Sequence, residues 1–452
     1  MVGHLADDRR EFAGRHVGPT IFVYIPELNE DLRPGFRVGA AVERRKLPRL
    51  HLGDVIARAD RTAFITEDQR GVRRHREHLE KIAKVDVCRN SLVDRVHVGV
   101  FSVSLFIGGL SATYLGKQMD RIGAATIMTL GSVLVALTLA LCAWSPSVAV
   151  FATGIILLEV SSGMVQYQAA FATLVESDPR SASRSITYLT LIGGFASTIF
   201  WPISAALSGW MSWREIYLVY AALNLFLCMP LHFWIMRVGK TGSNADTAAR
   251  PREAVIGAIP HDARRRGMIM VSFAFALLGF TLAAILAHMV PMLGSIGLGA
   301  AAVVIGSLFG PAQVASRLIN MVFGKNLSPP ALAVLSAVLI VFGILILLAT
   351  GDWLPGAVAF AICLGLGFGI NSIAQGSLPL YLFGSDGYGT ITGKMAAARL
   401  ALGAGAPFAF SAAMENLGLS LSLIGNACLG AVSIAAFVAV AVSCQRPATA
   451  TV

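Results

Sequence analysis

Eleven long apolar runs follow residue 95, and they constrain the fold more than any other feature of the sequence. A membrane-spanning helix needs about 20 mainly apolar residues, which each run provides. Backbone groups inside a bilayer find no water to bond, so such runs must be helical. We therefore expect an all-α polytopic membrane protein. The runs cover approximately residues 96–116, 124–145, 148–174, 185–209, 214–237, 267–291, 297–323, 330–350, 354–383, 391–413 and 418–442.

Composition separates the chain into two regions. The protein is 55% hydrophobic and only 14% charged, whereas soluble domains carry about 25% charged residues. Residues 1–95 nevertheless contain 19 of the 36 Lys and Arg and 15 of the 26 Asp and Glu. We expect this charged N-terminal segment to be non-native or disordered.

Basic residues in the loops predict the orientation of the helices. Cytoplasmic loops of membrane proteins carry an excess of Lys and Arg. We therefore expect a multi-pass protein of the plasma (inner) membrane with a cytoplasmic C-terminus. The loops on the predicted cytoplasmic side hold Lys117, Arg121, Arg180, Arg184, Lys325, Lys394 and Arg446, whereas the opposite loops hold only Arg214.

A hydrophilic stretch at 238–266, rich in Gly, Pro and basic residues, predicts a cytoplasmic linker between two halves. An internal repeat supports this division, because Gly116–Lys117 aligns with Gly324–Lys325 at an offset of 208 residues. Duplicated halves of this kind are a known architecture of membrane proteins. The predicted halves are 96–237 and 267–445, followed by a cytoplasmic tail at 446–452.

The same offset predicts that one span is missing. The second half opens with the run at 267–291, so its counterpart in the first half belongs near 59–83. That segment holds eleven charged residues, and each Lys, Arg or Asp near the centre of a span costs about 2.5–3.5 kcal/mol. We therefore expect the first transmembrane helix to be absent.

The turn after the first run carries "GKQMDRIG", which resembles the G-x-L-x-D-R-x-G-R-R motif of the major facilitator superfamily (MFS). Gly116, Asp120, Arg121 and Gly123 fit this pattern, while Ala124 and Ala125 replace its basic pair. The motif, the repeat and the linker extend the resemblance over residues 96–445. It implies a two-half bundle, here with eleven helices (5 + 6) instead of twelve.

The motif has a physical interpretation as a gate. Gly116 and Gly123 permit close helix packing and a sharp turn. Asp120 can stabilise the N-terminus of its own or a neighbouring helix, and Arg121 can bind acids across the interface. In the superfamily this cluster helps to close the cytoplasmic side. The alternative is that Lys117 and Arg121 only enforce topology.

Two arginines inside predicted spans are candidates for substrate binding. Ionisable groups within a membrane are costly and are therefore functional hypotheses by default. Arg317 and Arg399 lie in the spans in which the monocarboxylate and oxalate–formate carriers of the superfamily use basic residues. The planar guanidinium fits a carboxylate, so the substrate is expected to be a small organic anion. The alternative is that both side chains extend toward the water at the membrane surface.

Glu159 and His288 are the other ionisable residues that stand out in predicted spans, His288 near the outer end of its span. A carboxyl in the membrane interior can carry a proton, so Glu159 is the candidate for proton coupling. The alternative is a structural pair with one of the arginines. Polar side chains that can line a cavity include Gln313, Tyr167 and Asn371, together with Gln166, Gln168, Tyr188, Asn320 and Gln375.

These observations favour a secondary active transporter that works by alternating access, as a single chain in the lipid bilayer. No Gly-x-x-x-x-Gly-Lys-Ser/Thr motif and no metal-ligand spacing occurs, so we expect no enzyme activity, cofactor or metal. A defective or misannotated copy without transport activity is the main alternative. A membrane-anchored regulator is the third, although residues 1–95 carry mixed charges and no nucleic-acid recognition motif, so no nucleic acid is expected.

Overall fold

The computed structural model describes residues 99–245 and 254–445 of the protein. The predictions made for residues 1–95, including the absence of a first span near 59–83, lie outside the described residues, as does the predicted tail at 446–452.

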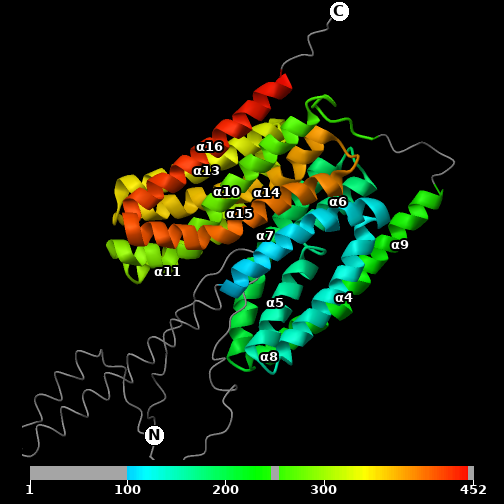
Figure 1. The fold of residues 1–452 in the computed structure, drawn as a ribbon, viewed down its shortest axis with the longest axis horizontal. Coiled ribbons are helices and arrows are strands. Elements are labelled where there is room, and N and C mark those ends of the chain that lie inside the picture. The colour runs from blue at the N-terminus through cyan, green and yellow to red at the C-terminus, as the bar shows by residue number, and fades with distance from the viewer. Residues whose placement is uncertain (1–98, 246–253, 446–452) are drawn as a thin grey trace, which may run out of the picture. The chain divides into compact units, whose positions relative to one another are not determined.

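The first half of the described chain consists of consecutive helices (Figure 1). The first of them, Gly99–Ile122, has no label in the figure. The helices that follow are α4 (Ala124–Ala143), α5 (Val148–Ser162), α6 (Tyr167–Ser177), α7 (Ala182–Ser208), α8 (Trp213–Leu223), the π-helix η1 (Asn224–Cys228) and α9 (Met229–Ala245).

The second half is built in the same way and lies beside the first (Figure 1). Its helices are α10 (Arg264–Leu293), the π-helix η3 (Gly294–Leu298), α11 (Ala301–Ser307), α12 (Phe309–Phe323), the 3-10 turn η4 (Gly324–Asn326), α13 (Pro329–Thr350), α14 (Leu354–Phe383), α15 (Tyr388–Leu417) and α16 (Leu419–Gln445).

The all-helical membrane fold predicted from the apolar runs is confirmed. Ten helices in the described residues are long and apolar enough to cross a membrane. The run at 185–209 forms α7, which is helical over 27 residues and is therefore about 40 Å long at 1.5 Å per residue. The total of eleven spans stays a prediction.

The turn at the "GKQMDRIG" motif is shorter than the sequence predicted. The first helix continues through Gly116 and Asp120 to Ile122, and only Gly123 leaves the helical conformation, with φ +92°. Glycine tolerates this positive φ because it has no Cβ. The motif therefore forms the last two turns of a helix, so its side chains have fixed directions.

One predicted span is broken in the middle. The run at 148–174 forms two helices, α5 and α6, which are separated by residues 163–166. Glu159 lies one turn before the break, and Tyr167 is the first residue after it. Irregular backbone at membrane depth is tolerated where it is buried in protein or lines a cavity, and binding sites of transporters often lie at such breaks.

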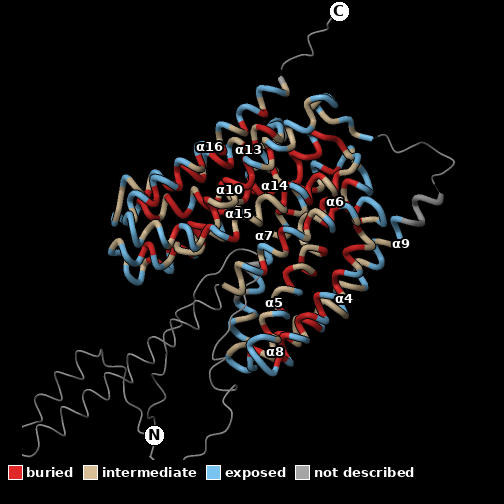
Figure 2. Tube along the Cα trace, in the orientation of Figure 1, coloured by how far each residue is buried: buried red, intermediate tan, exposed pale blue. Residues whose placement is uncertain are grey.

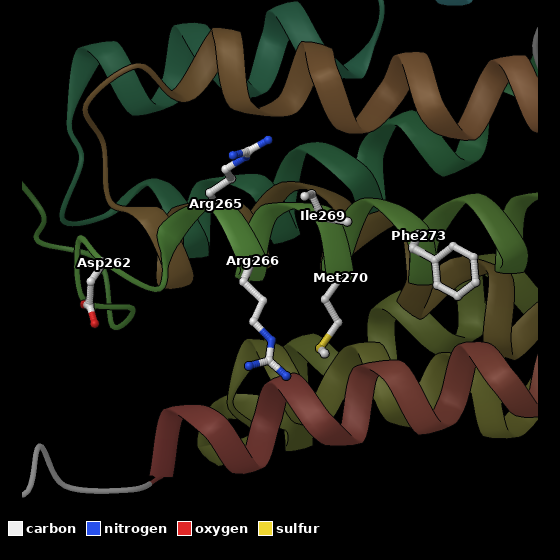
Figure 3. Close-up of a pocket in the computed structure, with 6 residues that line it drawn as sticks. All are labelled: Asp262, Arg265, Arg266, Ile269, Met270 and Phe273. Atoms are coloured by element: carbon white, nitrogen blue, oxygen red, sulfur yellow. The ribbon is translucent and has the colours of Figure 1, made fainter.

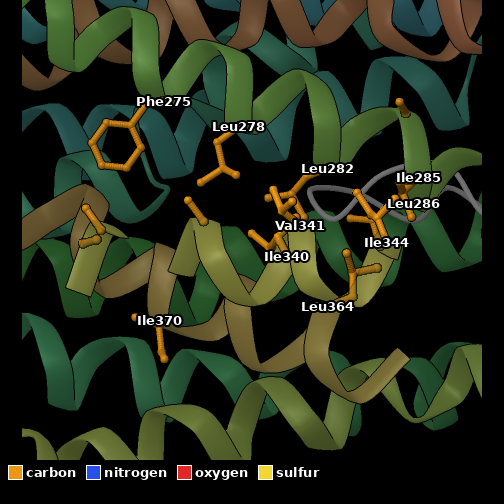
Figure 4. Close-up of a cluster of buried hydrophobic side chains, with 14 of the residues drawn as sticks. Phe275, Leu278, Leu282, Ile285, Leu286, Ile340, Val341, Ile344, Leu364 and Ile370 are labelled. Carbon is orange, nitrogen blue, oxygen red and sulfur yellow. The ribbon is translucent and has the colours of Figure 1, made fainter. Parts of the chain in front are cut away.

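The hydrophobic core of the second half lies between α10, α13, α14 and α16. Phe275, Leu278, Ile340 and Leu364 are among its buried side chains, as Figure 4 shows. A second cluster joins Leu115, Ile127 and Phe171 of the first half to Leu380 and Tyr388 of the second. The two halves therefore share a packed interface at one end of the bundle.

Helices at the periphery are exposed over much of their length (Figure 2), and many of their exposed residues are large and apolar. The most apolar window of Leu354–Phe383 is 67% buried, but that of Trp213–Gly239 is only 6% buried. Phe226 and Trp234 are 76% and 64% exposed. An exposed apolar surface of this kind is unfavourable in water, but it is the normal lipid-facing surface of a membrane helix.

The described end of the predicted linker is anchored to the turn between α14 and α15. The Ala258 and Ile259 amides donate to the carbonyl oxygens of Tyr381 and Leu382 at 2.9 and 3.0 Å. Val255 also accepts a bond from the Ser385 amide at 3.1 Å. At the other end of the predicted linker, α9 continues to Ala245. Both described parts of the predicted linker are therefore structured.

Glycines allow α14 to pack closely against α12. A Cβ added at Gly365 would lie 2.6 Å from both the Ala312 Cβ and the Phe309 carbonyl oxygen. Real Cβ atoms do not approach other atoms this closely, so larger side chains here must separate the helices. Small residues at such positions are characteristic of helix packing in membranes.

We therefore predict that Gly365→Leu destabilises the protein, because the added atoms overpack the contact between α12 and α14. The expected loss is about 1–3 kcal/mol, measured as a lower thermal unfolding temperature of the detergent-purified protein. Gly405→Leu is the matched control, since a Cβ at Gly405 meets no atom within 4 Å. Equal unfolding temperatures for both variants would contradict the close packing.

Candidate functional site

Arg317 lies on α12 and is only 2% exposed. Its Nε donates a hydrogen bond to the Ser372 Oγ of α14 at 3.1 Å. Its Nη1 is buried and has no hydrogen-bond partner among the described residues. A buried guanidinium with a neutral partner and an unused donor is a costly arrangement, so this group is the strongest candidate for binding an anion.

Two glycines of α7 make room for this arginine. A Cβ added at Gly194 would collide with the Nη1 of Arg317, and one at Gly193 would lie 2.5 Å from the Tyr167 hydroxyl. Tyr167 and Arg317 thus lie against adjacent positions of α7. The site therefore combines α6 and α7 of the first half with α12 and α14 of the second.

The other predicted cavity residues lie on the same helices. Asn371 precedes Ser372 on α14 and is 3% exposed, and its Oδ1 has no hydrogen-bond partner among the described residues. Gln313 is half-buried one turn before Arg317, and its backbone packs against Gly369 of α14. The structure thus brings Arg317, Gln313 and Asn371 to the packed contact of α12 with α14.

Glu159 of α5 lies within electrostatic range of the other predicted arginine, Arg399 of α15, but no direct ion pair joins them among the described residues. Glycines again provide space for both side chains. A Cβ at Gly108 would lie 2.7 Å from the Glu159 Cγ, and one at Gly279 would lie 2.7 Å from the Arg399 Cγ. The charge of Glu159 thus acts mainly on Arg399, whereas Arg317 bonds the neutral Ser372.

Asp120 connects the two halves at the N-terminus of α15. Its Oδ1 accepts a hydrogen bond from the Gly389 amide at 2.8 Å. Its Oδ2 accepts bonds from the Thr390 amide at 2.7 Å and from the Thr390 Oγ1 at 2.6 Å. The carboxylate thus bonds amides that have no partner within the helix, and it lies at the positive end of the helix dipole.

The helix that carries Asp120 touches α15 through backbone atoms. A Cβ at Gly116 would collide with the Gly389 carbonyl oxygen and lie 3.2 Å from the Cα of Gly393. Close backbone approach holds Asp120 within reach of α15. The gap between the halves is therefore closed at this end of the bundle.

The remaining motif residues have local contacts. Gly123 begins the turn to α4, whose first amide, that of Ala124, donates to the Glu176 Oε2 at 2.9 Å. Arg121 is exposed, and no acid bonds it within the part of the chain that the structure describes. His288 lies apart from both arginines, with its Nδ1 3.0 Å from the Ala284 carbonyl oxygen of the preceding turn.

Several residues of these sites were not singled out from the sequence. Ser372 is one serine among many in the spans, and Gly108, Gly193 and Gly194 read as ordinary packing glycines. The partners of Asp120 had the clearest signal in the sequence. Gly389 and Thr390 lie within three residues after Gly387, and Gly384 and Gly387 both have positive φ. A helix start after two such glycines is a place where an acidic partner is expected.

Comparisons with known proteins agree with this architecture. The sequence matches the family model of the Major Facilitator Superfamily over residues 93–407. The human organic anion transporter MFSD10 (TETRAN) has a similar fold, with a TM-score of 0.60 and 14% identity over 75% of this chain and 82% of the transporter. The proton:xylose symporter XylE has a TM-score of 0.57 and 12% identity over 75% and 85% of the two chains. No curated protein matches the sequence significantly.

We predict that Asp120→Ala weakens the N-terminus of α15. Removing a capping side chain costs about 1 kcal/mol, which corresponds to roughly fivefold faster opening. Hydrogen exchange should therefore accelerate at the Gly389 and Thr390 amides. Asp178→Ala, which removes an exposed carboxylate bonded to Ser181 at 2.5 Å, should leave these amides unchanged. Unaltered exchange in Asp120→Ala would contradict the role of Asp120.

Proposed function

Because the chain belongs to the major facilitator superfamily, whose family model covers residues 93–407, we propose that it is a secondary carrier for a small organic anion. It moves this solute across the membrane by alternating access. The observation that carries the substrate class is the buried Nη1 of Arg317, which has no hydrogen-bond partner among the described residues.

The charges of the interior support an anion. Arg317 and Arg399 contribute two positive charges and Glu159 one negative charge, and Glu159 attracts Arg399 without a direct ion pair among the described residues. Arg317 therefore keeps an uncompensated charge in a region where each buried ion is costly. A bound carboxylate would offset this charge and could accept two parallel hydrogen bonds from the guanidinium.

The arrangement is similar to the monocarboxylate and oxalate–formate branch of the superfamily, in which basic residues of the corresponding spans contact the substrate. In this chain Arg317 takes the role of binding, with Gln313, Tyr167 and Asn371 as neutral partners around it. One protein of similar fold is an organic anion transporter and the other is a sugar symporter. The choice of an anion therefore rests on Arg317 and not on the fold.

The gate of this carrier is the contact of Asp120 with α15. Its bonds to Gly389 and Thr390 join the two halves at one end, and they must break when that end opens. Gly116 supports them through its close contact with Gly389. The loop charges predict that this end faces the cytoplasm, with the C-terminus on the same side of the plasma (inner) membrane and a single chain as the working unit.

Glu159 is the candidate for proton coupling. The attraction between Glu159 and Arg399 exists only when Glu159 is ionised, so protonation would remove it. A proton that binds Glu159 could therefore favour one conformation of the carrier over the other. The alternative is that the pair only stabilises the bundle.

We predict that Arg317→Gln strongly reduces uptake of labelled short-chain carboxylates into vesicles that contain the protein. Loss of a charge-assisted bond costs about 1.5–3 kcal/mol, which corresponds to a decrease of about 10- to 150-fold in transport efficiency. Arg317→Lys should keep part of the activity, because it retains the charge but loses the planar fork. Equal uptake by the wild type and Arg317→Gln would remove Arg317 from the site.

Arg184→Gln is the control for this experiment, since the exposed Arg184 bonds Tyr188 at 2.8 Å and lies outside the site. It should transport like the wild type. If the wild type itself transports no solute above the level of empty vesicles, the chain is better described as a defective copy with an intact fold.

A second prediction separates proton coupling from pairing. If Glu159 carries the proton, Glu159→Gln should lose the acceleration of uptake by an inward proton gradient but keep gradient-independent exchange. If the pair is only structural, Glu159→Gln should lower the unfolding temperature by leaving Arg399 unpaired, and Glu159→Gln/Arg399→Gln should restore it. Both quantities are measured on the same preparations. Loss of gradient dependence indicates proton coupling, and a lower unfolding temperature that the double variant restores indicates a structural pair.

A further inference from the structure

A shallow depression lies on the outer surface where α10 begins, away from the contacts of Arg317 and Arg399. It combines charged residues at the helix start with apolar residues further along the same helix, as Figure 3 shows. Its lining residues are Asp262, Arg265, Arg266, Ile269, Met270 and Phe273.

The two arginines of this depression are exposed, and no described residue bonds either guanidinium. They extend to opposite sides of α10 in Figure 3, with Arg266 and Met270 directed toward α16. The neighbouring Arg264 differs, because its guanidinium donates to the Phe383 carbonyl oxygen and fixes the start of the helix. Arg265 and Arg266 are therefore available to a ligand, whereas Arg264 holds the structure.

The apolar part of the depression is exposed too. Ile269 and Phe273 are 60% and 50% exposed, and they follow Arg265 and Arg266 by about one and two turns on the helix. From Arg265 to Phe273 the helix rises about 12 Å at 1.5 Å per residue. The depression therefore changes from charged to apolar along the direction in which the helix enters the membrane.

This order matches one class of ligand. A phospholipid presents a phosphate at the membrane surface and acyl chains below it, and basic residues near the surface attract anionic lipids. The Arg265 guanidinium can bind a phosphodiester, and the acyl chain can cover Ile269 and Phe273, which follow Arg265 by one and two turns. Asp262 at the rim is an acceptor, so it favours a headgroup with hydroxyl donors over one with a further negative charge.

We propose that the start of α10 binds an anionic phospholipid with a hydroxyl-bearing headgroup, its phosphate at Arg265 and its chain along Ile269 and Phe273, while Arg266 on the other side of the helix adds a second positive charge near the headgroup. The site is independent of the proposed transport of an anion. It would hold α10, a central helix of the second half that contacts both α15 and α16, at a fixed depth in the membrane.

The test is lipid retention by the full chain, purified in mixed micelles and measured by native mass spectrometry. Phosphatidylglycerol should be retained and phosphatidylcholine released. In Arg265→Gln/Arg266→Gln the affinity for phosphatidylglycerol should fall about 25-fold, which corresponds to roughly 1 kcal/mol for each arginine. Ile269→Ser/Phe273→Ser should also reduce retention, although it changes no charge.

The matched control is Arg180→Gln/Arg184→Gln, which removes two positive charges from another exposed turn at a helix start. It should retain phosphatidylglycerol like the wild type. The proposal is overturned if this control loses the lipid equally, if phosphatidylcholine binds as tightly, or if millimolar inorganic phosphate displaces the lipid and thereby identifies a free-phosphate site. Should the arginine variant fail to fold, undiminished retention by Ile269→Ser/Phe273→Ser overturns it as well.

Discussion

A charge inside the hydrocarbon region costs about 2.5–3.5 kcal/mol even when the surroundings adapt, and the interior of this chain is arranged around that cost. Glu159 lies within electrostatic range of Arg399, without a direct ion pair among the described residues. Arg317 has Ser372 as its hydrogen-bond partner, and its Nη1 has no partner among the described residues. The two arginines look alike in sequence, but their surroundings differ. The proposed anion would offset the charge of Arg317.

Glycines at the helix interfaces leave room for these charged side chains. Gly108 faces Glu159, Gly194 faces Arg317 and Gly279 faces Arg399, each on a different helix. Each glycine leaves space for a long side chain that crosses to another helix. Small residues between membrane helices therefore do more than improve packing, since here they determine which polar groups can meet.

Local sequence patterns predicted the all-helical membrane fold and its long apolar helices, because apolar length is a local property. The pairing of residues was not predictable in this way. Asp120 bonds Gly389 and Thr390, about 270 positions later, and no spacing rule connects them. The length of the turn at Gly123 was also missed, since helix ends depend on tertiary contacts as well as on propensity.

The anchored end of the linker has a mechanical consequence. Ala258 and Ile259 bond the last residues of α14, and Val255 bonds the turn that leads into α15. The covalent path from α9 into the second half therefore reaches this turn before it reaches α10. A force that reaches the second half through residues 254–263 would therefore act first on this turn, close to Gly389 and Thr390, where Asp120 contacts α15.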